Sequence, residues 1–313
     1  MRLIGGTGGN IKFGSQLHNS ATSWENITAV LETMEAGSWH SVWFYDHFVP
    51  PVSHTDEVLE HDKIPTFEGW SLLCATAAVT KRLRLGLLVA GNTYRNPALM
   101  AKMAATVDHI SNGRLVIGIG AAWHVREHQA YGWEFPSMRE RSDRLEEACK
   151  LLKTLFMAED LVDFDGKYYK LNRAPFAPKS VQQPHPPIMV GGGGEKRTLR
   201  TLALYGDIMN ISNGPEEVKR LSGVLKRHCE TVGRDPSEIR KTVQVPIHIV
   251  NDEQKAADLR GGQDWKMIGP PQYVIDRAQD FIDAGVDEFT FNMIPNDPEV
   301  YAELNETVLS AFD

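Results

Sequence analysis

The chain has 313 residues, of which 42% are hydrophobic and 24% charged, and its formal net charge is −8. This length is usual for an α/β barrel, and the acidic balance argues against nucleic acid as a partner. No apolar run approaches the ~20 residues that a membrane-spanning helix needs, and no signal peptide is visible, so we expect a cytoplasmic protein without a membrane partner. Cys74, Cys149 and Cys229 lack metal-type spacing and should be reduced thiols.

Strand-like and helix-like segments alternate along the chain. Short apolar runs predict strands over residues 11–16, 41–45, 83–89, 115–119, 188–190, 208–211, 243–250 and 288–292. Amphipathic runs predict helices over residues 24–36, 70–79, 97–110, 139–156, 196–205, 216–232, 253–259, 271–284 and 298–311. An Asp-Gly turn predicts a hairpin near residues 164–169. The eight strand-helix units predict an α/β fold, a (β/α)8 TIM barrel forming a single domain over residues 1–313, with insertions in the loops at the carboxyl ends of the strands.

Asp46 and His47 follow the apolar run Ser41-Val-Trp-Phe-Tyr, where the second strand should end. In parallel α/β proteins, ligands bind just beyond the carboxyl ends of the strands. Histidine titrates near neutral pH, so we predict that His47 gives or takes a substrate proton, and that Asp46 orients it or contacts a cofactor. The alternative is an Asp-His pair that only caps the following loop.

Three further strand ends carry residues that could bind a ligand. They are Leu88, Val89, Ala90 and Asn92 after the third strand, Trp123 and Arg126 after the fourth, and Gly191, Gly192, Gly193, Gly194 and Arg197 after the fifth. The carboxyl ends of all barrel strands meet at one mouth. We therefore expect Asp46, His47, Val89, Trp123 and Gly192 to surround that mouth. Trp123 could exclude water there, or could equally be a buried core residue.

The four consecutive glycines predict an anion site. Glycine lets the backbone approach a phosphate closely, and the helix expected to follow offers unpaired N–H groups, with Lys196 and Arg197 adding positive charge. The spacing is not that of a Walker loop, and Gly118-Ile-Gly120 lacks the third glycine of a dinucleotide fingerprint. A flexible turn without a ligand is the alternative.

One motif points to a different chemistry. His124-Val-Arg-Glu127-His128 matches H-x-x-E-H, the inverted zinc-peptidase pattern. Such a site needs a stable helix and a third ligand, whereas this motif follows a glycine-rich strand end and precedes Gly132. We therefore predict no metal site and favour a loop that faces the substrate or a phosphate.

Several ordered motifs together resemble the luciferase-like monooxygenase superfamily. They are Ser41-Val-Trp-Phe-Tyr-Asp-His47, Arg95-Asn-Pro-Ala98, Ser111-Asn-Gly-Arg-Leu-Val-Ile-Gly-Ile-Gly120, Asp165-Gly-Lys-Tyr-Tyr169 and Pro186-Pro-Ile-Met-Val-Gly-Gly192. The resemblance covers nearly the whole chain and is greatest to the branch of oxidoreductases that depend on coenzyme F420, a deazaflavin. It implies a (β/α)8 barrel whose mouth holds a flavin-like ring.

The resemblance also implies roles for individual residues. Asp46 and His47 would lie against the deazaflavin ring and the substrate, and a cis peptide bond at Leu88–Val89 would support the ring. The glycine run would hold the cofactor phosphate. Trp123 stands where sugar-phosphate dehydrogenases of the family carry an acidic proton donor, and Glu127 could replace that donor only with a different loop path. The predicted cofactor site comprises Asp46, Leu88, Val89, Ala90, Asn92, Trp123, Arg126, Gly191, Gly192, Gly193, Gly194 and Arg197.

The expected function is therefore hydride transfer between coenzyme F420 and a small organic substrate. Two alternatives stay open: a monooxygenase of the same fold that uses FMN and dioxygen, and a non-catalytic flavin-binding protein. The second alternative would not need an ordered acid-base pair such as the one that includes His47. We also expect a homodimer and a small-molecule substrate, with no nucleic-acid or membrane partner.

Overall fold

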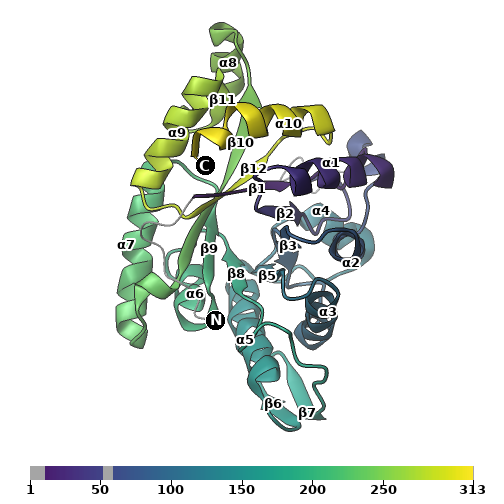
Figure 1. The fold of residues 1–313 in the computed structure, drawn as a ribbon. Coiled ribbons are helices and arrows are strands. Elements are labelled where there is room, and N and C mark those ends of the chain that lie inside the picture. Colours follow the sequence, from purple (N-terminus) through teal and green to yellow (C-terminus); the bar gives the residue numbers. More distant parts are fainter. Residues whose placement is uncertain (1–10, 52–58, 313) are drawn as a thin grey trace.

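The computed structural model describes residues 11–51 and 59–312, and within them eight parallel strands close into a barrel (Figure 1). The barrel strands are β1 (Lys12–Gln16), β2 (Ser41–Phe44), β3 (Arg84–Leu87), β5 (Leu115–Gly120), β8 (Ile188–Gly191), β9 (Ile208–Ile211), β10 (Arg240–Ile249) and β12 (Glu288–Asn292). Each pairs with the next, and pairing of β12 with β1, at Lys12 opposite Glu288, closes the ring. The predicted (β/α)8 barrel is confirmed.

Helices connect the strands and cover the outside of the barrel (Figure 1). They are α1 (Trp24–Ala36), α2 (Gly69–Val79), α3 (Pro97–Ile110), α4 (Val125–Tyr131), α5 (Met138–Met157), α6 (Thr198–Tyr205), α7 (Pro215–Val232), α8 (Glu253–Arg260), α9 (Pro271–Asp283) and α10 (Pro298–Thr307). Short 3-10 helices occupy Glu60–Lys63, Pro236–Glu238 and Leu309–Phe312. Two short strands, β4 (Ala90–Gly91) and β11 (Met267–Gly269), extend the sheet beside β5 and β10.

Local sequence signals set most helix ends. The Ser23 side chain accepts a hydrogen bond from Asn26 N–H at the start of α1, and Asn96 caps α3 directly before Pro97. Gly233 ends α7 with a φ of 70°, a left-handed conformation that glycine adopts without steric cost. The helices therefore begin and end where the sequence indicates, within a few residues.

Two layers of apolar side chains pack on opposite sides of the barrel wall. Trp43, Val116, Met189 and Ile208 form one cluster, whereas Val42, the neighbour of Trp43 in β2, belongs to the large cluster that includes the helices. Because alternate residues of a strand point to opposite faces, the small cluster is the filling of the barrel and the large one is the layer between strands and helices. Burial on both faces explains why the strands read as continuous apolar runs.

The structure differs from the sequence predictions at two insertions and at the end of one strand. The segment after β5 was expected to be a loop but contains α4, and β11 forms within residues 261–269, where no element was expected. The third strand ends at Leu87, two residues early. The predicted hairpin is confirmed as antiparallel β6 (Val162–Asp165) and β7 (Lys170–Ala174), and it projects beyond α5 (Figure 1).

Among the described residues, every helix is too short or too polar to span a bilayer. The three cysteines are unpaired, as predicted. Cys149 and Cys229 are buried, and Cys74 is partly buried. Burial raises the pKa of the Cys149 thiol to about 12, so this sulfur is a packing residue at neutral pH.

Candidate functional site

Val89 lies on the floor of the barrel mouth. A Cβ added to Gly120 of β5 would come within 2.7 Å of Val89 Cγ2, and one added to Gly191 of β8 within 2.9 Å of the same atom. The two glycines therefore make room for the Val89 side chain between neighbouring strands. The Leu88–Val89 peptide bond is cis, as the family resemblance implied.

Two glutamines support this floor from inside the barrel. Gln16, the last residue of β1, donates from Nε2 to Leu88 O at 2.9 Å, and Gln244 of β10 donates to Gln16 Oε1 at 2.8 Å. These hydrogen bonds connect strands that are 228 residues apart in sequence. The sequence analysis did not identify either residue, because a single glutamine within an apolar strand forms no recognisable motif.

Asp46 is buried and bound to Arg95 rather than to His47. Arg95 donates from Nε to Asp46 Oδ2 at 2.8 Å and from Nη2 to Asp46 Oδ1 at 2.5 Å, and Gly91 N–H donates to Oδ2 at 3.1 Å. Burial raises the pKa of the Asp46 carboxyl, and the bonds from Arg95 oppose that rise. The prediction that Asp46 orients His47 is wrong, because its oxygens hold the loop between β3 and α3.

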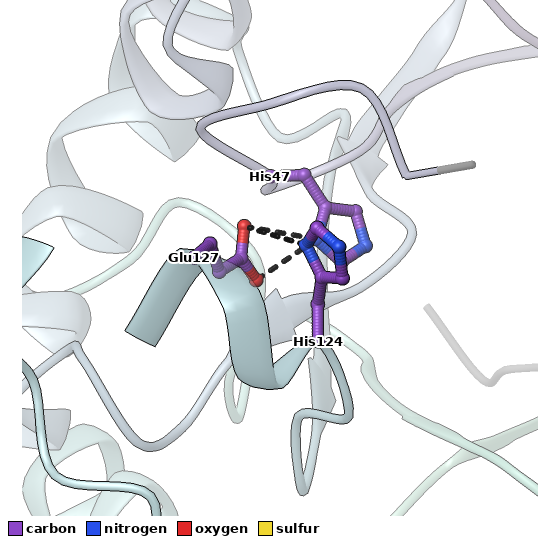
Figure 2. A group of neighbouring side chains, drawn as sticks. All are labelled: His47, His124 and Glu127. Atoms are coloured by element: carbon purple, nitrogen blue, oxygen red, sulfur yellow. Dashed lines mark hydrogen bonds and ion pairs between the residues drawn. The ribbon is translucent and has the colours of Figure 1, made fainter. Parts of the chain in front are cut away.

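Glu127 holds His47 instead (Figure 2). His47 Nδ1 lies 3.0 Å from Glu127 Oε1 and 3.2 Å from Oε2, and Phe48 N–H donates to Oε2 at 3.1 Å. The Glu127 side chain is 0% exposed and that of His47 is 15% exposed. The sequence analysis required a different loop path if Glu127 was to reach the mouth. Helix α4 provides that path, because it places Glu127 beside the loop after β2. A carboxylate at Nδ1 fixes the imidazole tautomer and leaves Nε2 for the proton that a substrate gains or loses.

The environment of Glu127 favours its charged form. Burial by itself raises the pKa of this carboxyl, but contacts with the His124 and His47 imidazoles and with Phe48 N–H outweigh burial and lower the pKa to about 2. The carboxylate is therefore ionised at neutral pH and faces two imidazoles.

Trp123 lies at the edge of the mouth. Its ring centroid is 5.2 Å from that of His47 and 4.9 Å from that of His124, and 36% of the residue is exposed. The alternative of a buried core tryptophan is therefore wrong. An indole beside the proton-bearing imidazole provides an apolar wall that can exclude water from one side of the mouth.

The glycine run after β8 forms a bare backbone turn. Gly192 has a φ of 108°, and a Cβ there would meet only Thr198 Cγ2, at 3.8 Å. Within the described residues, neither Gly193 nor Gly194 donates a backbone hydrogen bond. Helix α6 begins at Thr198, two residues later than predicted. Backbone N–H groups without internal partners fit a phosphate.

Other predicted cofactor residues have side-chain partners within the protein or are enclosed. Arg197 pairs with Asp143 of α5, Arg126 donates to Asp62 at 3.1 Å, and Asn92 donates to Tyr169 of the hairpin segment at 3.1 Å. Leu88 and Ala90 are 8% and 0% exposed, so their side chains are largely packed. Asp46, His47, Val89, Trp123 and Gly192 all follow the carboxyl ends of barrel strands, which a closed parallel barrel places at one end.

His128 does not join His124 as the zinc-peptidase pattern would require. Its Nδ1 lies 2.7 Å from His124 O and its Nε2 lies 2.6 Å from Thr93 Oγ1, so both ring nitrogens have partners. The short helix α4 instead directs Glu127 to His47. The motif spacing could have indicated Glu127, because residues three apart on a helix share a face with His124.

The comparisons with known proteins agree with this geometry. A family model described as luciferase-like monooxygenase matches residues 8–265. The chain belongs to this family. Two curated relatives are named F420-dependent glucose-6-phosphate dehydrogenase: one from Amycolatopsis mediterranei is 31% identical over 70% of this chain and 63% of its own length, and one from Kineococcus radiotolerans is 34% identical over 72% and 64%. The chain thus matches less than two thirds of the length of these relatives.

A solved structure of the same fold is an F420-dependent secondary alcohol dehydrogenase in complex with an F420-acetone adduct. The two chains superpose with a TM-score of 0.82 at 20% identity, over 97% of this chain and 100% of the other. At this identity the match supports the barrel fold and the placement of its strand ends.

Proposed function

We propose that this luciferase-family protein transfers a hydride between coenzyme F420 and a small organic substrate. The main observation behind the proposal is the His47–Glu127 pair at a barrel mouth where β8, the neighbour of β5, ends in a bare glycine turn. Two relatives named for F420-dependent dehydrogenation support the choice of cofactor. When bound, a deazaflavin supplies two-electron hydride chemistry, and the protein supplies position and a proton.

The residues fit such a group. The Gly193 and Gly194 N–H groups, which donate no backbone hydrogen bond, would hold the cofactor phosphate beside α6, and Gly192, whose N–H donates to Asn210 O, would shape the turn. Val89 and the glycines around it would form the surface beneath the ring. The fit rests on the exposed backbone and on the space that the glycines leave, and Arg197 contributes little because it is paired with Asp143.

His47 would move the substrate proton. Glu127 engages Nδ1 and holds the ring in one orientation, so Nε2 is the nitrogen free to give or take a proton in the mouth. Glu127 acts through His47 and is a positioning residue. Trp123 would exclude water from the same side of the substrate, which strengthens the interaction between charged groups there.

Titration with each cofactor tests the proposal. Purified protein would be titrated separately with F420 and FMN, and bound cofactor would be measured from the change in visible absorbance and fluorescence. We expect saturable binding of F420, followed by a substrate-dependent change of its visible band in a screen of alcohols and sugar phosphates. Tight binding of FMN without detectable binding of F420 would contradict the proposal and favour the FMN-dependent monooxygenase. The predicted homodimer and cytoplasmic location remain predictions.

A further inference from the structure

His47, His124 and Glu127 form a cluster of metal-type ligands, and the proposed hydride transfer uses His47 and Glu127 but not His124 (Figure 2). An ion on His47 Nδ1 would replace the hydrogen bond to Glu127, so metal binding and proton transfer by His47 would be alternative states of the site. One ligand atom from each residue lies within 4.8 Å of the other two. His47 comes from the loop after β2, and the other two come from the beginning of α4. We propose that this trio binds a divalent transition-metal ion of the zinc type.

The spacing of the ligand atoms suits such an ion. His47 Nδ1 lies 3.0 Å from Glu127 Oε1, and His124 Nδ1 lies 3.7 Å from Glu127 Oε2. Zinc binds imidazole nitrogen and carboxylate oxygen at about 2.0–2.2 Å, so tetrahedral ligands lie about 3.3–3.6 Å apart. These two separations lie on either side of that range, and all three ligand atoms lie within 4.8 Å of one another, so binding requires the side chains to rotate toward the ion.

The His124 ring supplies an independent indication. This residue is 3% exposed, and within the described part of the chain its buried Nδ1 has no hydrogen-bond partner. Buried polar nitrogens are usually satisfied by a hydrogen bond or a bound group, so this one indicates a ligand. The nitrogen faces the Glu127 carboxylate, at a distance longer than a hydrogen bond. An ion between the two groups would satisfy both.

Zinc sites in other proteins use the same combination of ligand side chains. Two imidazoles and one carboxylate are the protein ligands of some catalytic zinc sites, in which a fourth position stays open to water or substrate. His47 is 15% exposed and neighbours the exposed Trp123, so the trio is accessible from the mouth. This site differs from the one that the H-x-x-E-H spacing suggested, because His47 takes the place of His128. The prediction of no metal came from sequence spacing that could not include His47.

The experiment uses the full-length protein without added cofactor, so its result does not depend on the proposed hydride transfer. Protein treated with a chelator and then dialysed would be titrated with Co²⁺ and followed by visible absorbance. We expect a ligand-field band that saturates at one ion per chain and disappears on addition of Zn²⁺. Zn²⁺ should also raise the melting temperature, because it binds the folded state.

Matched variants locate the site. His124→Ala and Glu127→Gln should each weaken Co²⁺ binding by about two orders of magnitude and abolish the shift in melting temperature. His109→Asn removes an exposed histidine of α3 and should change neither. His124→Gln provides a larger replacement should the alanine variant fold poorly, and circular dichroism would check the fold. Absence of a saturable band, or equal affinity in the His124 and His109 variants, would overturn the proposal.

Discussion

The two sides of the barrel mouth are built in opposite ways. On the side of β2 and β5, side chains from distant segments converge, and buried carboxylates are each held by a cation or an imidazole: Asp46 by Arg95, and Glu127 by His47 and His124. On the side of β8, the surface is backbone, and the nearest arginine, Arg197, turns outward to Asp143.

This difference separates two physical tasks. Moving a proton requires a titratable group whose orientation and charge are set by neighbours, and burial makes those neighbours indispensable. Holding an anion through backbone N–H groups requires only that no side chain intervenes. We therefore expect substitutions on the first side to have large effects and substitutions on the second side to have smaller ones.

The largest effect is expected for His47→Ala. This change should lower kcat by about 10²–10⁴-fold, the usual contribution of a positioned general acid or base. F420 affinity should stay near the wild-type value, because the cofactor phosphate is assigned to the glycine turn after β8 and not to His47. Steady-state kinetics with the substrate found in the screen, together with F420 titration, measures both. Loss of F420 binding with normal turnover by the fraction that still binds would make His47 a structural residue.

Arg95→Met should cause the next largest effect, on stability. The substitution leaves the buried Asp46 carboxylate without its charged partner, and such a loss costs about 3–5 kcal/mol. The matched control is Arg197→Met, which breaks a half-exposed pair with Asp143 and should cost less than about 1 kcal/mol. Urea denaturation followed by circular dichroism compares the two. Equal losses would remove the contrast between the two sides of the mouth.

The pH dependence of the free energy of unfolding should report the ionisation of the Glu127 carboxylate. The folded-state pKa of Glu127 is lowered to about 2, from an ordinary value of 4.5. Because the folded pKa is the lower one, this group contributes full stability above pH 4.5 and loses that contribution as pH falls from 4.5 to 2. One pKa unit corresponds to about 1.4 kcal/mol, so the loss is on the order of 3 kcal/mol.

Glu127→Gln removes the titrating group and should flatten this part of the curve. Unfolding free energies of wild type and variant would be measured between pH 5 and pH 2, and the slopes compared rather than the absolute values. Parallel slopes in the two proteins would contradict the assignment of a low pKa to Glu127.

The smallest effect is expected at the glycine turn. Gly192→Ala places a side chain at a φ of 108°, and Gly233→Ala does the same at a φ of 70° at the end of α7, so both variants carry backbone strain. Only the Gly192 variant should weaken F420 binding, by about tenfold, or about 1.4 kcal/mol. Equal F420 affinity in the two variants would show that the glycine turn does not bind the cofactor phosphate. Gly193 is a poorer choice, because a Cβ there meets Leu221 Cδ1 at 3.0 Å.

The sequence by itself determined the barrel and the positions of most of its strand ends. Apolar runs buried on both faces, caps such as Asn96 before Pro97, and the alternation of periodic segments are local signals, and each acts within a few residues. The same locality explains why the turn at the glycine run could be predicted: its property is backbone freedom, which the residue type alone supplies, whereas its binding of a phosphate stays a prediction. His47 was found because it directly follows an apolar strand.

Only the tertiary structure decided which groups face one another. Glu127 lies 80 residues from His47, and no local pattern states that α4 returns to the loop after β2. For the same reason Asp46 appeared to be the partner of its neighbour in sequence, although the fold places Arg95 between β3 and α3 against it, and Arg197 appeared free until α5 brought Asp143 beside it. Charges pair through space, and the burial that sets their pKa values exists only after the barrel has closed.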